Sequence, residues 1–207
     1  MDASDVRSEW ADRTGEYSPR YYAYYGPNEV SEALLPVLSD RVRTSASILE
    51  LGCSSGRHLA HLLEHGYQDV AGVEINEDAL TVMAEEFPSL ADAGTFYAEP
   101  IESVVESLDD DAFDVVFSAQ TLQHLHGDVD RVFDEIRRIA KSFIITAEIE
   151  GADRRGDRET LVRDVDEGLP LTHRNWRTVF ERGDFRQTHV EQIDVDTLRV
   201  FERQPDR

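Results

Sequence analysis

Ile48-Leu49-Glu50-Leu51-Gly52-Cys53-Ser54-Ser55-Gly56-Arg57 is the stretch that decides the fold of this chain. Its apolar first half is typical of a buried strand, and Leu59, Leu62 and Leu63 follow at helical spacing. The small residues between them predict a tight turn that enters a helix N-terminus. Backbone N–H groups and the positive end of the helix dipole meet there, and glycine lets a ligand approach the main chain. The stretch therefore predicts a site for a nucleotide-like ligand.

The rest of the chain alternates predicted strands and helices, a pattern typical of an α/β fold. Further strands are expected at 70–75, 95–98, 113–117 and from 143, and helices at 76–87, 101–108, 129–141 and 176–180. Pro88 is expected to end the first of these helices, at 76–87. Alternating segments at 189–193 and 198–201, joined by a short turn, predict an antiparallel hairpin. The sequence thus predicts a doubly wound, Rossmann-like, mostly parallel seven-stranded sheet with helices on both faces and this hairpin at its C-terminal end.

The composition is strongly acidic. The 207 residues include 43 Asp and Glu against 21 Lys and Arg, the formal net charge is −22, and Lys141 is the only lysine. Because the charge is spread along the chain, it resembles that of proteins from extreme halophiles, where molar salt shortens the Debye length to about 3 Å. An acidic surface also disfavours nucleic acid, which needs a basic footprint. We therefore expect a halophilic protein, and in molar salt the charge argues only weakly against a nucleic-acid substrate.

Three further features bear on the cellular location. Cys53 is the only cysteine, so no intrachain disulfide is possible and a reducing compartment is expected. The N-terminus lacks the charged and apolar regions of a leader peptide, and no apolar stretch approaches the roughly 18 residues of a membrane span. The sequence predicts a soluble cytoplasmic protein without membrane contact, and it points to no metal site.

The motifs resemble those of the class I S-adenosylmethionine-dependent methyltransferases over roughly residues 45–203. Glu50 to Gly56 is similar to the glycine-rich first motif of that family, with Ser54 in place of the middle glycine. Glu74, at the end of the second predicted strand, matches the acidic residue that holds the cofactor ribose. Glu99 to Ile101 stands at the position where that family holds the adenine ring of the cofactor, and Phe113 to Leu125 is similar to the fourth motif of the family. The resemblance implies S-adenosylmethionine as the methyl donor.

The resemblance also implies a set of residues that contact the cofactor: Glu50, Gly52, Cys53, Ser54, Gly56, Glu74, Ile75, Glu99, Pro100, Ile101, Ser118 and Ala119. In that family the carboxylate in the place of Glu50 lies near the amino-acid end of the cofactor, so the resemblance implies the same here. A solvated strand charge is the weaker reading, since the flanking residues are apolar and a buried carboxylate is costly without partners. Glu74 can accept hydrogen bonds from both ribose hydroxyls. Serine at position 54 is compatible with the motif if its backbone avoids positive φ. Cys53 is expected to fill space in the turn.

Three other functions compete with an active small-molecule methyltransferase. A dinucleotide-binding unit is the weaker alternative, because its G-x-G-x-x-G spacing places Ser54 and Arg57 where glycines are required. A catalytically silent cofactor-binding regulator would show the same cofactor motifs. A methyltransferase of RNA or protein would need an exposed groove and, for RNA, a local basic face.

The sequence indicates the methyl acceptor less clearly than the methyl donor. Ser118-Ala119-Gln120-Thr121 stands where amino-methylating enzymes of nucleobases carry an Asn/Asp-Pro-Pro-aromatic motif. His124, Glu148 and His173 are candidates for proton removal, although His124 is also typical of a packing residue. The candidates for substrate contact are Tyr21, Tyr22, Tyr25 and Gln120.

Two segments are expected to flank the acceptor. Residues 1–44 form a predicted N-terminal helical and aromatic lid on a methyltransferase domain at 45–207, and the alternative is a segment that only packs on the domain. The connection at 151–171 carries Arg154, Arg155, Arg158 and Arg163, either as an anion site or as a loop neutralised by its own acidic residues.

Overall fold

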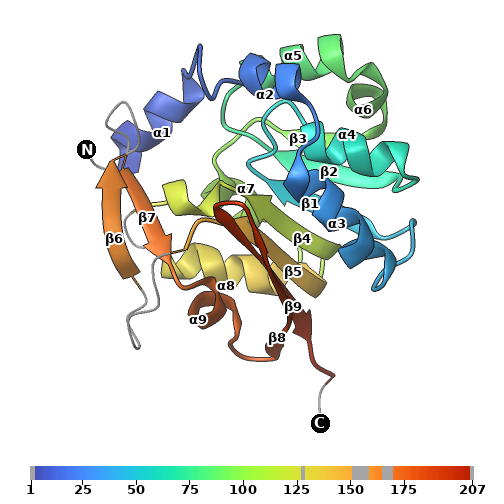
Figure 1. Cartoon of the computed structure of the whole chain (residues 1–207), viewed down its shortest axis with the longest axis vertical. Coiled ribbons are helices and arrows are strands. Elements are labelled where there is room, and N and C mark those ends of the chain that lie inside the picture. The colour runs from blue at the N-terminus through green and yellow to red at the C-terminus, as the bar shows by residue number, and fades with distance from the viewer. Residues whose placement is uncertain (1–2, 127–128, 151–158, 165–169, 206–207) are drawn as a thin grey trace.

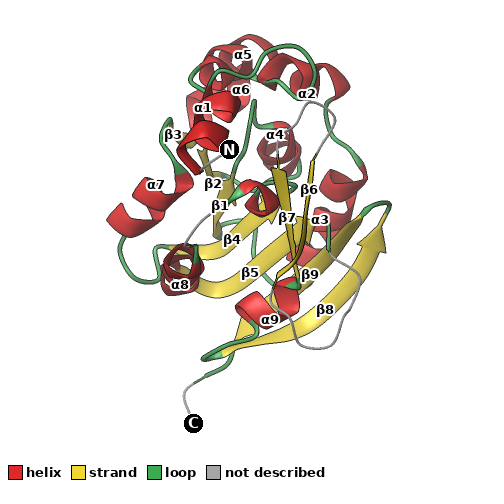
Figure 2. Ribbon diagram, turned by 90° about the vertical axis from the view of Figure 1, so that its left-hand side faces the viewer, coloured by secondary structure: helices red, strands yellow, loops and turns green. Residues whose placement is uncertain are grey.

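The structure, a computed structural model, describes residues 3–126, 129–150, 159–164 and 170–205. Its centre is a seven-stranded sheet in the order β3-β2-β1-β4-β5-β9-β8 (Figures 1 and 2). The strands are β1 (Ser47–Leu51), β2 (Asp69–Val73), β3 (Thr95–Tyr97), β4 (Phe113–Ala119), β5 (Ala140–Glu148), β8 (Phe185–Ile193) and β9 (Asp196–Arg203). The first five are parallel, and β9 runs antiparallel to both β5 and β8. The predicted Rossmann-like sheet with a C-terminal antiparallel hairpin is confirmed.

Helices cover both faces of the sheet. One hydrophobic cluster packs α3 (Glu29–Ser39), α4 (Arg57–Glu64), α5 (Asp78–Glu86) and α6 (Pro88–Ala93) on one face. A second cluster packs α7 (Ile101–Ser107), α8 (Asp130–Ile139) and α9 (Trp176–Phe180) on the other. Neighbouring residues of β1 divide between the clusters, since Ile48 belongs to the first and Leu49 to the second. Strand residues buried on both sides explain why β1 is apolar at Ile48, Leu49 and Leu51, the pattern that predicted it.

Two segments contain elements that were not predicted. The helix before Pro88 does end there, since α5 stops at Glu86, but Pro88 also begins α6, where the N–H that proline lacks is not needed. Within the charged connection at 151–171, β6 (Glu159–Asp164) and β7 (Pro170–Arg174) pair as a two-stranded antiparallel ribbon (Figure 1). Arg154, Arg155 and Arg158 lie outside the described residues, as does the side chain of Arg163.

Two short helices precede α3, and both lie outside the sheet at the top of Figure 1. These are α1 (Ala3–Ala11) and α2 (Pro19–Tyr25). The Asn76 side-chain amide donates to the backbone carbonyls of Trp10 and Arg13 at 3.3 and 3.2 Å, and Arg7 lies 3.0 Å from Glu102. These contacts join the N-terminal segment to the loop after β2 and to α7.

The turn after β1 is packed too tightly for larger residues. Gly52 has a φ of +74°, and a side chain there would collide with Thr121. Gly72 of β2 lies beside Cys53, and a Cβ at position 72 would stand 2.5 Å from the Cys53 sulfur. Cys53 is 2 % exposed. It therefore fills the space beside Gly72, as predicted from its place in the turn.

Candidate active site

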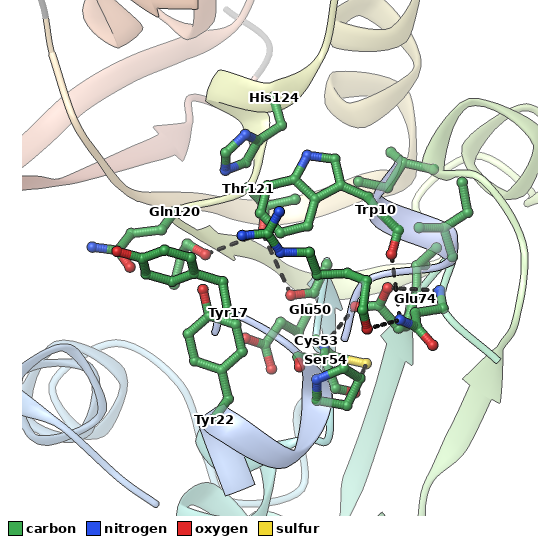
Figure 3. A pocket seen from close by; sticks show the side chains of 18 of the residues that line it. Trp10, Tyr17, Tyr22, Glu50, Cys53, Ser54, Glu74, Gln120, Thr121 and His124 are labelled. Atoms are coloured by element: carbon green, nitrogen blue, oxygen red, sulfur yellow. Dashed lines mark hydrogen bonds between the residues drawn. The ribbon is translucent and has the colours of Figure 1, made fainter. Parts of the chain in front are cut away.

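A pocket opens at the carboxyl ends of β1, β2 and β4, the end of a parallel sheet where ligands bind in open α/β folds. The empty space between its walls, open mouth included, is about 1010 Å³. In the view of Figure 3, Gln120, Tyr17 and Tyr22 stand at one end, Glu74 stands at the other, and Glu50 lies between them. The N-terminal segment forms part of the wall, with Val6, Arg7, Trp10, Arg13, Tyr17, Pro19 and Tyr22.

Glu74 connects the turn after β1 to the loop after β2. Its Oε2 accepts a hydrogen bond from the Ser54 backbone N–H at 2.8 Å, and its Oε1 accepts one from the Asn76 N–H at 2.9 Å. Burial raises the pKa of this carboxyl, and the backbone donors oppose the shift. Each carboxylate oxygen can accept a further hydrogen bond. Glu74 is thus a fixed acceptor that can meet a diol in the pocket.

Ser54 corrects one expectation. A serine in place of the middle glycine was expected to avoid positive φ, yet Ser54 has a φ of +49°. In this left-handed conformation a residue with a side chain is strained by about 1–2 kcal/mol relative to the right-handed form. The Ser54 N–H points at Glu74 Oε2 in this conformation. The hydrogen bond to the carboxylate offsets the strain of the turn.

Glu50 is the most unusual polar residue in the pocket. It is 1 % exposed, and neither of its carboxylate oxygens has a hydrogen-bond partner among the described residues. Burial raises the pKa of Glu50 well above its ordinary value, although the Arg57 guanidinium favours the ionised form. An unpartnered buried carboxyl is costly, and a cationic or hydrogen-bond-donating ligand would supply what it lacks.

The loop after β4 is held by a second buried glutamate, Glu148 of β5, which is 0 % exposed. Its oxygens accept hydrogen bonds from the Ser118 hydroxyl at 2.8 Å and from three consecutive backbone N–H groups, those of residues 121–123, at 3.1, 3.1 and 3.4 Å. This loop supplies Gln120, Thr121 and His124 to the pocket. Glu148 itself does not line the pocket and acts on the shape of the loop.

His124 faces the N-terminal segment. Its ring centroid lies 4.4 Å from that of Trp10, in an edge-on arrangement. Burial, together with the neighbouring His126, lowers the pKa of His124 to about 3. The imidazole is therefore neutral at physiological pH. The packing that the sequence suggested for His124 is present, and the residue also lines the pocket.

Most of the residues expected at the site do meet there. The pocket is lined by Glu50, Gly52, Cys53, Ser54, Glu74, Ile75, Pro100, Ile101, Ala119, Gln120, Tyr22 and His124. The structure places the remainder elsewhere. Gly56 faces Leu90 and Met83, Glu99 is exposed, and Ser118 is turned to Glu148. Tyr21 and Tyr25 line a separate outer hollow, and His173 is half-buried on β7.

Sequence reasoning missed the role of several pocket residues. Arg57 follows the glycine-rich turn directly, so its position alone could have identified it. Trp10 and Arg13 lie far away in the sequence, and only the fold of the N-terminal segment brings them to the pocket. Asp196 stands at the start of β9, where its Oδ2 accepts a hydrogen bond from the Gln120 side-chain amide at 2.8 Å. No sequence pattern links these two residues.

Glu148 also gives the protein a predicted pH dependence. Burial raises its pKa from 4.5 to about 7, so the native state binds this proton more tightly than the unfolded state does. The corresponding stability is fully present below about pH 4.5 and is lost as the pH rises through about 7. His58 and His124, whose pKa values are lowered, act in the opposite sense. We therefore compare wild type with Glu148→Gln, which retains both histidines.

The expected result is that the stability of the wild type relative to Glu148→Gln falls between about pH 4.5 and 7. Urea unfolding across that range, followed by circular dichroism, measures the difference. A difference that is constant with pH would contradict a buried Glu148 that titrates near neutrality.

Comparisons with known proteins address the activity. Residues 49–143 match the family model described as a methyltransferase domain. The match covers somewhat less than half of the chain, and the matched segment is similar to that family. It contains the glycine-rich turn, Glu74 and the loop after β4 up to the start of β5. No curated protein sequence matches the chain significantly.

Solved structures resemble this chain over most of its length. An S-adenosylmethionine-dependent methyltransferase from Mesorhizobium loti has a TM-score of 0.63 and 20 % identity, covering 83 % of this chain and 98 % of its own. The 1,6-didemethyltoxoflavin-N1-methyltransferase of Burkholderia thailandensis has a TM-score of 0.70 and 16 % identity, covering 99 % of this chain and 87 % of its own. The magnesium protoporphyrin IX methyltransferase of Synechocystis has a TM-score of 0.66 and 13 % identity, covering 99 % of this chain and 98 % of its own. At these identities the likeness shows the fold.

Two searches of the described residues bear on other functions. None of the described helices is both long and apolar enough to cross a membrane. Within the same residues, no group of three or more His, Cys, Asp or Glu side chains is arranged to hold a metal ion.

Proposed function

We propose that this chain transfers a methyl group from S-adenosylmethionine to a small molecule bound in the pocket at the carboxyl ends of β1, β2 and β4. The single observation that supports this most is Glu74, which is fixed by the backbone N–H groups of Ser54 and Asn76 at the edge of that pocket. A carboxylate in this place suits a ribose diol. The family match over residues 49–143 supports methyl transfer as the reaction.

The residues of the pocket fit this cofactor along its length. Pro100 and Ile101 offer an apolar surface to the adenine, and Glu74 accepts from the ribose hydroxyls. The orphaned oxygens of Glu50 accept from the ammonium of the amino-acid end. Gly52 leaves room for the methionine portion to approach the backbone. The bound sulfonium supplies an activated methyl group, so the chain need only hold an acceptor in line with the S–CH₃ bond and exclude water.

The N-terminal segment supports a small acceptor. Trp10 and Tyr22 of this segment line the pocket, and such aromatic walls suit a buried small molecule better than a long polymer. We propose that residues 1–44 act as the cover of this site. No residue lining the pocket is assigned as the base. Neutral His124 can accept a proton only weakly, and acceptors that lose their proton to solvent need none.

The acidic composition supports a halophilic, cytoplasmic enzyme, because 43 acidic residues against 21 basic ones suit a solution in which molar salt screens self-repulsion. Assays are therefore designed in molar KCl. In such salt the net charge of −22 opposes a nucleic-acid substrate only weakly.

Turnover tests the proposed function. A metabolite panel is incubated with the protein and S-adenosylmethionine in molar KCl, and release of S-adenosylhomocysteine is measured. The proposal predicts acceptor-dependent release by the wild type and a strong loss in Glu74→Ala. Binding of the cofactor without release from any metabolite would favour a silent regulator instead.

Glu50 gives a further prediction. Burial raises the pKa of its carboxyl well above the ordinary value in the ligand-free state, so this carboxyl holds its proton more tightly than an exposed glutamate does. Pairing with the cofactor ammonium favours the ionised form, so binding is expected to release up to one proton. Calorimetric titrations in buffers of different ionisation enthalpy measure this release. The release should vanish in Glu50→Gln, and equal proton release by wild type and variant would refute the assignment.

A further inference from the structure

Arg57 is a half-buried arginine that lines the pocket without a carboxylate partner among the described residues. In the part of the chain that the structure describes, eight arginines lie within 3.3 Å of a carboxylate oxygen: Arg7, Arg20, Arg131, Arg137, Arg138, Arg177, Arg199 and Arg203. The guanidinium of Arg57 has no such neighbour, and it donates no hydrogen bond to any described residue. It instead lies over the Tyr22 ring, 4.8 Å from the centroid.

The position of Arg57 explains why this lack of a carboxylate partner matters. Arg57 lines the pocket and begins α4. The N-cap of that helix is Gly56, which has no side chain that could accept a hydrogen bond from the first turn. Both the guanidinium and the helix N-terminus therefore offer donors to an anion. Its stacking on Tyr22 holds the guanidinium plane in place while the N–H groups stay available.

The neighbouring charges limit what kind of anion fits. Glu50 and Asp196 both interact electrostatically with Arg57, without contacting it. Asp196 is 4 % exposed, and its Oδ1 has no hydrogen-bond partner among the described residues. A doubly charged phosphate beside two carboxyl groups would meet strong repulsion. A singly charged carboxylate can instead pair with the planar guanidinium through two parallel hydrogen bonds.

Gln120 supplies a second polar contact at this end of the pocket. It lines the pocket, and its φ of +51° is unusual for a residue with a side chain. The hydrogen bond from its Nε2 to Asp196 Oδ2 fixes the direction of the amide. One amide N–H and the carbonyl oxygen then remain for a ligand. Asp196 is a positioning residue for Gln120, since it does not itself line the pocket.

We propose that Arg57 binds a carboxylate at the end of the pocket formed by Tyr22 and Gln120. The inference rests on the proposed function and extends it to the chemistry of the ligand. The carboxylate has two possible sources: the amino-acid end of the cofactor and a methyl acceptor that is itself a carboxylic acid. Both place the same anion on the same guanidinium, and the experiment separates them.

The first arm measures binding by calorimetry in molar KCl. S-adenosylhomocysteine and its decarboxylated analogue are titrated into wild type, Arg57→Gln, Arg57→Lys and the control Arg43→Gln, which removes an exposed arginine outside the pocket. If Arg57 holds the cofactor carboxylate, Arg57→Gln binds S-adenosylhomocysteine about 10- to 100-fold more weakly. Binding of the decarboxylated analogue stays unchanged, and Arg57→Lys retains part of the affinity.

The second arm measures turnover of small carboxylic acids and their matching amides, with release of S-adenosylhomocysteine as the signal. If Arg57 holds the acceptor carboxylate, S-adenosylhomocysteine binds Arg57→Gln normally. The wild type then prefers an acid over its amide at least tenfold in kcat/KM, and Arg57→Gln loses this preference. Thermal unfolding of each variant verifies that it is folded.

The inference is overturned if Arg57→Gln binds S-adenosylhomocysteine like the wild type and the wild type shows no preference for acids, or if the preference survives in the variant. A different result marks failure of the proposed function itself. In that case the wild type binds neither S-adenosylhomocysteine nor its decarboxylated analogue.

Discussion

Glu148→Ala is expected to lower the free energy of unfolding by about 3–5 kcal/mol. The substitution removes a buried carboxyl group and leaves the buried donors that bond to it without an acceptor. These donors are the Ser118 hydroxyl and the N–H groups of Thr121, Leu122 and Gln123. The three N–H groups belong to the loop that carries Gln120 and His124 into the pocket. The substitution should therefore also weaken cofactor binding. Urea unfolding and calorimetry measure the two effects.

Two controls make this prediction specific. Glu148→Gln retains the size of the side chain and one carbonyl acceptor, so it should cost less than Glu148→Ala. Glu191→Ala removes a glutamate whose side chain is 52 % exposed and should change stability by no more than about 0.5 kcal/mol. If Glu148→Ala unfolds at the same urea concentration as Glu191→Ala, the four hydrogen bonds do not hold the loop.

Glu74→Ala is expected to weaken S-adenosylmethionine binding by about 1–3 kcal/mol, or roughly 5- to 150-fold. The direct loss is the acceptor for the ribose hydroxyls. A second loss comes from the Ser54 N–H, which then has no carboxylate to offset the left-handed conformation of the turn. Calorimetric titration in molar KCl gives the affinity.

A nearby glutamate serves as the matched control. Glu77 follows the same strand but does not line the pocket, so Glu77→Ala should bind the cofactor like the wild type. Adenine alone, which lacks the ribose, should bind Glu74→Ala and wild type equally. Affinity for S-adenosylmethionine that is unchanged in Glu74→Ala would remove the main support for the ribose contact.

The parts of the fold that sequence predicted are those set by local patterns. The mostly apolar runs at Ile48 to Leu51, which Glu50 interrupts, and at Val70 to Val73 belong to strands buried on both faces, so the local pattern was enough to place them. The ribbon of β6 and β7 was missed because its sequence is mostly polar. Pro88 does mark the end of α5, but the start of α6 at the same residue was missed, because proline suits both positions.

The candidate site divides in the same way. Glu50, Gly52 and Glu74 stand at strand ends, where the chain order of a parallel sheet brings them together. Asp196 reaches Gln120 from a hairpin 76 residues later in the chain. Trp10 reaches His124 from the N-terminal helix. Contacts of this kind depend on tertiary packing, and no local spacing in the sequence reports them. The positive φ of Ser54 likewise follows from the hydrogen bond to Glu74.

The most direct test of the central claim is a calorimetric titration of S-adenosylmethionine into the wild-type protein in molar KCl, with NAD as the comparison ligand. The account predicts saturable binding of one S-adenosylmethionine per chain and no binding of NAD, since the pocket joins Glu50 and Glu74 around a turn with the wrong glycine spacing for a dinucleotide. Absence of S-adenosylmethionine binding by the folded protein would contradict it.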